Sequence, residues 1–282
     1  MGHSPDSVDW AEYGPDLIAD AEINAPMVNR ALEWLSRRVP QAGLILDVGS
    51  GPGVAACRFA QLLPGATVVA ADGAAPLLAL ARERAERLGV GDQLTTREVR
   101  LPEGIAALPR ADLIWVGGVA HHLPDPAAGI RAFGELLRPG GVLALREGGL
   151  PLHYLPAAAD DGLTARINGV DHKLSHDHAH PMGAIVAPRS WPELLAEAGL
   201  TGVRSRSFLL DLPAPLADAA RRHLARTLHR TRELLAKHLT ADDVDRLDIL
   251  TDPEHPESVL RRRDVFMLRA TTIHTAVRTR GL

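Results

Sequence analysis

Runs of apolar residues alternate with amphipathic segments through the first half of the chain. Four short runs are almost continuously apolar, the pattern of strands buried on both faces; they are residues 43–49, 66–72, 111–118 and 142–149. Three intervening segments repeat apolar residues at helical spacing: residues 54–63, 75–89 and 126–141. This alternation predicts an α/β fold, a doubly wound and mostly parallel sheet with helices on both faces. In such folds, ligands bind beyond the carboxyl ends of the strands.

The rest of the chain predicts a cap and insertions around this core. Residues 14–39 predict two helices and residues 215–239 a long amphipathic helix. Residues 240–250 predict a short helix, with Thr240 and Asp243 as a capping box at its start. Residues 148–190 form a long connection rich in turn residues, and connections of that length are commonly lids or binding loops. We expect four segments: residues 1–42 (helical cap), 43–210 (core, with the lid at 148–190), 211–263 (helical insertion) and 264–282 (final strand and tail).

Composition narrows the classes of function. The chain has 282 residues and a formal net charge of −4, so it lacks the basic footprint that is typical of nucleic-acid binding. Its one cysteine, Cys57, excludes a disulfide framework and is expected to be buried. No apolar run reaches the ~18 residues that span a bilayer, and the first residues are polar. We therefore expect a cytoplasmic protein that binds neither a membrane nor nucleic acid.

The first strand leads into a glycine-rich turn, residues 49–53, with the sequence Gly-Ser-Gly-Pro-Gly. This spacing differs from the dinucleotide fingerprint, and the absence of a Lys-Ser/Thr pair excludes a P-loop. Pro52 removes one amide that would face a phosphate, and Asp47 just before the turn would repel one. A carboxylate there suits a cationic ligand. Asp72 ends the second strand, a position suited to accepting hydrogen bonds from two ribose hydroxyls.

Four stretches in order resemble the class I S-adenosylmethionine-dependent methyltransferases. They are LILDVGSGPG at 44–53, VVAADGAAPLLALARERAERLG at 68–89, ADLIWVGGVAHHLPDPAAGIRAFGELLRPGGVLALRE at 111–147 and SWPELLAEAGLTGV at 190–203. The resemblance covers about residues 43–210 and a final strand near 264–276. It implies the Rossmann-like fold of that family, with seven strands, and S-adenosylmethionine as the cofactor.

The resemblance also implies the residues that bind the cofactor. The methionine end of the cofactor would lie directly against the main chain of the turn residues Gly49, Ser50, Gly51 and Gly53. Asp47 would lie near the α-amino group.

Asp72 would bind the ribose hydroxyls in the same scheme, and Gly73 would border the adenine. The family usually offers an acid to the adenine amino group after the third strand, but Arg100 stands there. Glu98 or the backbone around Leu101 could replace that acid.

Val116 and Gly117 would follow the fourth strand beside the sulfonium. Both come directly before the loop that carries the candidate catalytic residues.

Candidate catalytic residues follow the fourth and fifth strands. A hydroxyl or protonated-nitrogen acceptor gains from a base, and histidine titrates near neutrality. His121 or His122 is therefore a candidate base or substrate-orienting residue, and we expect only one of them to face the pocket. The alternative is that His122 packs under the loop. Glu147 ends the fifth strand and is a second candidate base, or else a residue of the rim or of a helix cap.

A histidine-rich segment lies in the expected lid. His172, His176, His178 and His180 occur with Asp171 and Asp177 in the stretch DHKLSHDHAH. The residue types suit a metal, but no helical His-pair with a glutamate base is present. We expect no metal site and interpret the segment as a polar lid or a solvated loop.

The sequence thus predicts methyl transfer to a small-molecule acceptor, an O or N nucleophile of a ring-bearing secondary metabolite. The sequence does not decide between O, N and C as the reacting atom. The chain could form a homodimer. A noncatalytic S-adenosylmethionine-binding protein, a methyltransferase acting on a protein, and a nucleotide-dependent oxidoreductase stay open as alternatives. The glycine spacing and Asp47 argue against the last of these.

Overall fold

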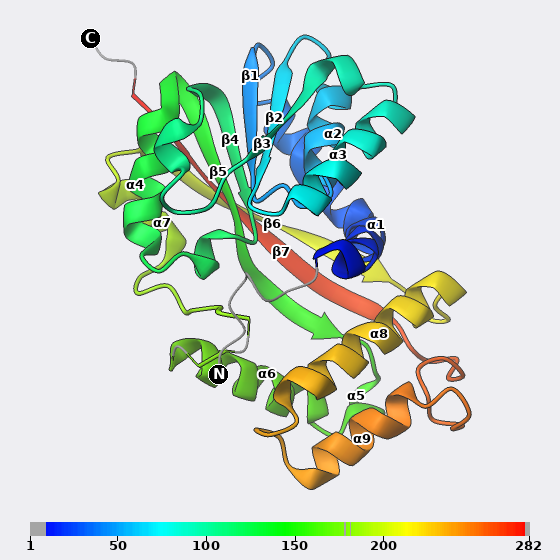
Figure 1. The fold of residues 1–282 in the computed structure, drawn as a ribbon. Helices are drawn as coiled ribbons and strands as arrows, with labels where there is room; N and C mark the ends of the chain where they lie inside the picture. Colours follow the sequence, from blue (N-terminus) through cyan, green and yellow to red (C-terminus); the bar gives the residue numbers. More distant parts are fainter. Residues whose placement is uncertain (1–9, 178, 181, 280–282) are drawn as a thin grey trace. The chain divides into compact units, whose positions relative to one another are not determined.

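The computed structural model describes residues 10–177, 179–180 and 182–279. Within them, seven strands form one sheet in the order β3-β2-β1-β4-β5-β7-β6 (Figure 1). The strands are β1 (Leu44–Val48), β2 (Thr67–Asp72), β3 (Leu94–Glu98), β4 (Ala111–Gly117), β5 (Leu137–His153), β6 (Thr201–Leu212) and β7 (Met267–Val277). The predicted α/β class and the strand count of the methyltransferase fold are confirmed.

Most of the sheet is parallel. β1 pairs with β2 and with β4, β2 with β3, and β4 with β5, all in parallel register. β7 runs the other way, because its end at Arg278 pairs with Gly140 and Gly141 while His274 lies against Glu147. The order reverses between β1 and β4, and ligands of doubly wound folds bind at this switch point.

The helices follow the predicted alternation. They are α1 (Trp10–Ser36), α2 (Val54–Leu62), α3 (Ala75–Arg87), α4 (Pro126–Leu136), α5 (Ala157–Asp160), α6 (Leu163–His176), α7 (Trp191–Glu197), α8 (Asp218–Leu235) and α9 (Ala241–Thr251). Short 3₁₀ turns are η2 (Gly91–Gln93), η3 (Ile105–Ala107) and η4 (Ala120–His122).

The chain divides into two compact units. The first comprises Val8–Gly148, Ala187–Phe208 and Thr271–Leu282, and it holds the parallel strands. In it, α1, α2 and α3 pack together on one face of the sheet and α4 and α7 on the other (Figure 1). On the α2 face, Phe59 meets Trp115 edge-on, with ring centroids 6.0 Å apart. On the α4 face, Ile130 and Phe133 are completely buried.

The second unit combines Gly149–Val186 with Leu209–Ala270. In it, α8 packs against α9 and α6. The buried Arg221 donates to the carbonyl oxygens of Leu216 and Val259, and Arg166 pairs with Asp243 at 2.8 Å. The expected lid and the expected helical insertion therefore share one unit.

Two local expectations were wrong. The two N-terminal helices are one, α1, although Pro15 and Pro26 lie inside it. A proline removes a helical hydrogen bond, but α1 packs against α2 and α3 and buries Met27, Leu32 and Leu35, which keeps it continuous. The connection at 148–190 is also more regular than expected, since β5 runs on to His153 and α6 follows.

Two smaller predictions are confirmed. Cys57 is buried, and burial raises the pKa of its thiol to about 11. The side chain of Thr240 caps α9 by accepting from the Asp243 amide.

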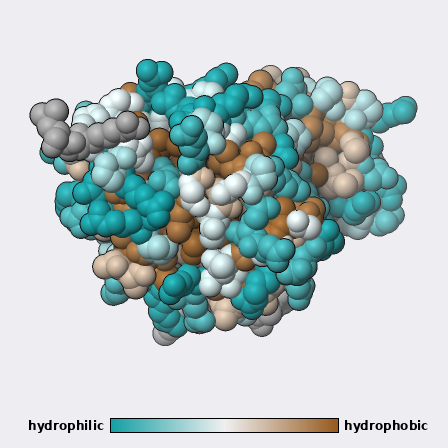
Figure 2. All heavy atoms as spheres, turned by 90° about the horizontal axis from the view of Figure 1, so that it is seen from above, coloured by the Kyte–Doolittle hydropathy of each residue, from teal (hydrophilic) through white to brown (hydrophobic). Residues whose placement is uncertain are grey.

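The surface has the usual mixed character. On the face shown in Figure 2, hydrophilic residues predominate and hydrophobic ones occupy smaller areas between them. Among the described helices, none combines the length and apolar character needed to cross a membrane.

Candidate functional site

The glycine turn after β1 is shaped chiefly by the protein's own packing. Gly49, Gly51 and Gly53 all have positive φ angles, of 66°, 52° and 72°. A Cβ on Gly49 would lie 2.2 Å from Val119, and a Cβ on Gly53 would lie 2.6 Å from Ala81 on α3. Around Gly51 there is open space, with no atom within 4 Å of such a Cβ. The middle glycine is therefore the one that leaves room for a ligand.

Two buried polar side chains beside this turn each have an oxygen atom without a hydrogen-bond partner among the described residues. They are Asp47, 2% exposed, whose Oδ2 makes no hydrogen bond, and Ser50, 8% exposed, whose Oγ makes none. Burial raises the pKa of Asp47 to about 7, and nearby Asp72 acts in the same direction, while an Ala56 backbone hydrogen bond and Arg146 oppose the shift. Buried polar groups are normally satisfied. The orphaned atoms fit a ligand that brings a cationic donor, as the α-amino group of S-adenosylmethionine does.

Asp72 closes the turn from the end of β2. Its Oδ2 accepts from the Gly51 amide at 2.8 Å and its Oδ1 from the Ala74 amide at 2.9 Å. Burial raises the pKa of Asp72, and the backbone N–H groups of Ala74, Gly51 and Gly73 oppose that rise. A carboxylate offers about four acceptor sites, so capacity is left for ribose hydroxyls.

The other predicted cofactor residues line the neighbouring strand ends. A Cβ on Gly73 would lie 3.6 Å from the Val99 carbonyl, so the strand end after β2 is close to the loop after β3. In that loop, Arg100 is exposed and Leu101 is half-buried, and Glu98 is exposed at the end of β3.

At the end of β4, Val116 is fully buried in the core on the α4 face, so its backbone is the part that borders the site. Gly117 is half-buried, and a Cβ there would lie 2.7 Å from the indole nitrogen of Trp115.

His121 and Glu147 form a hydrogen-bonded pair on the next strand ends. His121 Nδ1 lies 2.8 Å from Glu147 Oε2, and Glu147 Oε1 accepts from the Ala120 amide at 2.9 Å. The glutamate side chain is 4% exposed and the histidine 29%. Because the carboxylate accepts the proton on Nδ1, the Nε2 of His121 is the nitrogen that can take up a proton from a substrate.

The pair lies next to the glycine turn. Val119 packs against Gly49, and the following residue, Ala120, bonds Glu147. The loop after β4 therefore joins the predicted cofactor turn to the predicted base.

His122 lies beside His121. The 3₁₀ turn η4 sets the two imidazole rings side by side, with centroids 4.1 Å apart. His122 is exposed and so does not pack under the loop. Of the two rings, His121 is the one hydrogen-bonded to Glu147.

Arg146 is a residue of this region that sequence reasoning missed. It precedes Glu147 on β5, so the two side chains leave opposite faces of the sheet. The Arg146 guanidinium lies near Gly118, at 3.5 Å from the position of a Cβ there, and its charge acts on Asp47. The available signal was a pair of charges ending an otherwise apolar strand.

The histidine-rich segment does not assemble a metal centre among the described residues. His172 and His176 lie on α6, and His178 is outside the described residues. His176 contacts Asp177 at 3.2 Å, and His180 contacts Asp171 at 3.0 Å. In the described part of the chain, no three His, Cys, Asp or Glu side chains gather as ligands would.

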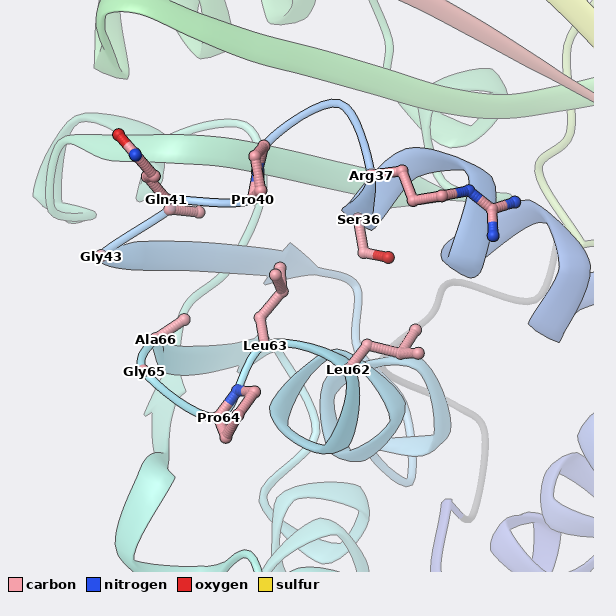
Figure 3. A pocket seen from close by; sticks show the side chains of 11 residues that line it. Ser36, Arg37, Pro40, Gln41, Gly43, Leu62, Leu63, Pro64, Gly65 and Ala66 are labelled. Atoms are coloured by element: carbon pink, nitrogen blue, oxygen red, sulfur yellow. The ribbon is translucent and has the colours of Figure 1, made fainter.

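A hollow of about 520 Å³ lies at the opposite, amino end of β1 (Figure 3). It is lined by Ser36, Arg37, Pro40–Gly43 and Leu62–Ala66. None of the predicted site residues borders it.

The chain is similar in sequence to known methyltransferases. Residues 46–143 match the family described as methyltransferase domain. A ubiquinone biosynthesis O-methyltransferase of Dinoroseobacter shibae is 39% identical over 175 residues, covering 61% of this chain and 66% of that protein. The nocamycin O-methyltransferase of Saccharothrix syringae is 34% identical over 217 residues, covering 70% and 72%. The chain spans from 28% to 67% of the length of the first curated relatives it matches.

The fold is similar to that of solved methyltransferases. Phospholethanolamine N-methyltransferase 2 of Haemonchus contortus, solved with S-adenosylhomocysteine, superposes with a TM-score of 0.53 at 15% identity. The match covers 98% of this chain and 61% of that one. At that identity the likeness concerns the fold alone.

Proposed function

The chain belongs to the class I S-adenosylmethionine-dependent methyltransferases, and on that basis we propose that it methylates a hydroxyl oxygen of a small molecule, with His121 as base. The observation that carries the proposal is the buried Glu147 carboxylate bonded to His121 beside the glycine turn. A methyl acceptor that must lose a proton is the kind of substrate that such a pair serves.

The cofactor would be held by polar side chains that lack a hydrogen-bond partner or can accept further hydrogen bonds. Asp47 and the Ser50 hydroxyl would receive the methionine end, and Asp72 would accept from the ribose hydroxyls. Gly51 would let the cofactor approach the backbone. When bound, S-adenosylmethionine supplies a methyl group made electrophilic by its sulfonium.

His121 would act on the acceptor directly, and Glu147 would act through His121. His121 Nε2 takes the hydroxyl proton while the oxygen forms its bond to the methyl carbon. The methyl group would come from bound S-adenosylmethionine, which would leave as the neutral thioether S-adenosylhomocysteine. Glu147 stabilises the imidazolium that results and keeps its ring in place through Nδ1. Positioning of the acceptor in line supplies much of the remaining rate.

A small-molecule acceptor is favoured over a macromolecule by two observations. The two relatives described above are named for ubiquinone biosynthesis and for nocamycin. The chain also has a net charge of −4, against the basic surfaces that nucleic acids require.

The test is turnover with defined acceptors. The protein is incubated with S-adenosylmethionine and a panel of phenols, catechols, aliphatic alcohols and amines, and S-adenosylhomocysteine is quantified. We expect product with a hydroxyl-bearing compound and a methyl ether in its mass spectrum. Binding of S-adenosylhomocysteine by calorimetry without turnover of any compound would favour a noncatalytic role, and turnover only with added protein would favour a protein acceptor. No binding at all would refute the proposal.

A further inference from the structure

A second histidine lies behind the catalytic pair, on β7. The Nε2 atom of His274 lies 3.2 Å from the main-chain oxygen of Glu147, and its Nδ1 lies 2.8 Å from the hydroxyl of Ser205 on β6. His274 is 9% exposed. Side chains of β6 and β7 are thereby linked to the backbone of the residue that holds His121.

The two partners fix the tautomer of His274. A carbonyl oxygen only accepts, so Nε2 carries the proton, and Nδ1 then accepts from the Ser205 hydroxyl. Burial lowers the pKa of His274, against the opposing effect of the Glu147 carbonyl and charge. The ring is therefore a neutral imidazole with both nitrogens bonded, and it is held in one orientation.

Two glycines follow Glu147 on β5. Gly148 and Gly149 have φ angles of 69° and 129°, a conformation that favours glycine, so the residues just beyond the carboxylate have no side chains to hold them in place. Backbone bonds tie β5 to β7 at Gly140 and Gly141, near the start of the strand. At Glu147 the His274 side chain adds a hydrogen bond to the main chain of β5, beside the neighbouring strand β7.

We infer that His274, oriented by Ser205, is a positioning residue that holds the backbone of Glu147 so that its carboxylate meets His121. The carboxylate makes two bonds of 2.8–2.9 Å to one short turn, η4. A small shift of its backbone would break that fit, and misplacement by about 1 Å can cost ~10²-fold in rate. The inference deepens the proposed function and rests on it for its kinetic part.

The variants are chosen to separate positioning from general support of the sheet. His274→Leu removes both hydrogen bonds, whereas His274→Gln keeps an N–H donor for the Glu147 carbonyl. Thr272→Val is the matched control, because Thr272 makes an equivalent 2.9 Å bond between β7 and β6, to Ser207. Ser205→Ala keeps the His274 ring and removes only its orienting partner.

The first readout needs no acceptor. The proton of the His121–Glu147 hydrogen bond is followed by NMR in the whole protein, with Glu147→Gln to assign it. We expect His274→Leu to abolish or broaden this signal, His274→Gln to retain it and Thr272→Val to leave it unchanged. If His274→Leu does not fold, Ser205→Ala is expected to weaken the signal in the same direction. An unchanged signal in the variant that folds overturns the inference, whether or not methyl transfer has been found.

The second readout is kinetic, with an acceptor that the panel has identified. We expect His274→Leu to lower kcat by about 10- to 100-fold while the affinity for S-adenosylhomocysteine stays within about twofold of wild type. In the Glu147→Gln background, His274→Leu should add almost nothing, because groups acting through one contact are not additive. Additive losses, or equal losses in Thr272→Val, would mean that His274 only supports the sheet. A wild-type protein without turnover refutes the proposed function but leaves the NMR result standing.

Discussion

The two halves of the site are built in opposite ways. Beside the glycine turn, Asp47 and Ser50 are buried with polar atoms that lack partners in the described protein. Two strands away, Glu147 is equally buried, yet both of its carboxylate oxygens are bonded, to Ala120 and His121. The first half has unsatisfied polar atoms that the proposed cofactor would satisfy, whereas the second half is satisfied within the protein itself.

This difference predicts which substitutions affect the binding of a ligand and which affect the chemical step. An unsatisfied buried carboxylate destabilises the fold, and a ligand that satisfies it recovers that free energy as affinity. A satisfied pair contributes little to affinity, but it lets a base act without rearrangement, which favours the transition state. We therefore expect substitutions in the first half to change affinity and those in the second half to change kcat.

The largest effect is expected in the second half. His121→Asn and Glu147→Gln should each lower kcat by ~10²–10⁴-fold, the usual contribution of a general base. Affinity for S-adenosylhomocysteine, measured by calorimetry, should stay close to wild type. His122→Asn is the control, since its ring lies 4.1 Å from that of His121 but Glu147 bonds His121. A kcat that survives both substitutions would mean that the rate comes from proximity alone.

A smaller effect is expected at Asp72. Asp72→Ala should weaken S-adenosylhomocysteine binding by ~1–3 kcal/mol, the scale for hydrogen bonds to a charged group. It should also destabilise the fold, because the carboxylate accepts from Gly51 and Ala74. Asp112→Ala separates the two effects: Asp112 likewise accepts from two amides, Gly43 and Leu44, but at the amino end of β1. Unchanged affinity in Asp72→Ala, or an equal affinity loss in Asp112→Ala, would remove Asp72 from the ribose site.

The smallest expected effect is the release of a fraction of a proton from Asp47 when a ligand binds. Since its pKa is raised to about 7, a bound ammonium should ionise it, and S-adenosylhomocysteine binding at neutral pH should release part of a proton. Calorimetry in buffers of different ionisation enthalpy measures this release, which Asp47→Asn should abolish.

The same substitution has a consequence for ligand-free stability. With the folded pKa above the unfolded value, the folded state binds more protons between about pH 4 and 7, so this group makes stability fall as pH rises through that window. Thermal unfolding across the window should show a flatter profile for Asp47→Asn than for wild type. Identical profiles would contradict the raised pKa.

The sequence predicted the strands and where they end better than it predicted the contacts between the elements. Apolar runs and helical spacing predicted β1, β2, β4 and the helices between them, because those signals are local. The continuity of α1 through Pro26 could not be predicted, because packing against α2 and α3 decides it. Helix α6 was not predicted within residues 148–190, because the 14 residues of α6 have a weak apolar face and include many polar residues.

The proposed catalytic pair shows the same limit. His121 and Glu147 were each candidates, but as alternative bases. Their partnership spans 26 positions and depends on the register of β4 against β5 and on the tight turn η4. His274 gave no signal at all, since an isolated histidine in a closing strand looks like any partly buried residue.

The packing of the glycine turn predicts which of the residues in and beside it would be conserved during evolution. Gly49 and Gly53 are required by Val119 and Ala81, whether or not a cofactor is ever bound. A lineage that gave up methylation would still keep both glycines, because folding alone selects for them. Asp47 and Ser50, which weaken the ligand-free fold, would be free to drift first. Among distant descendants, the buried acid and hydroxyl, rather than the glycines, would mark those that still bind the cofactor.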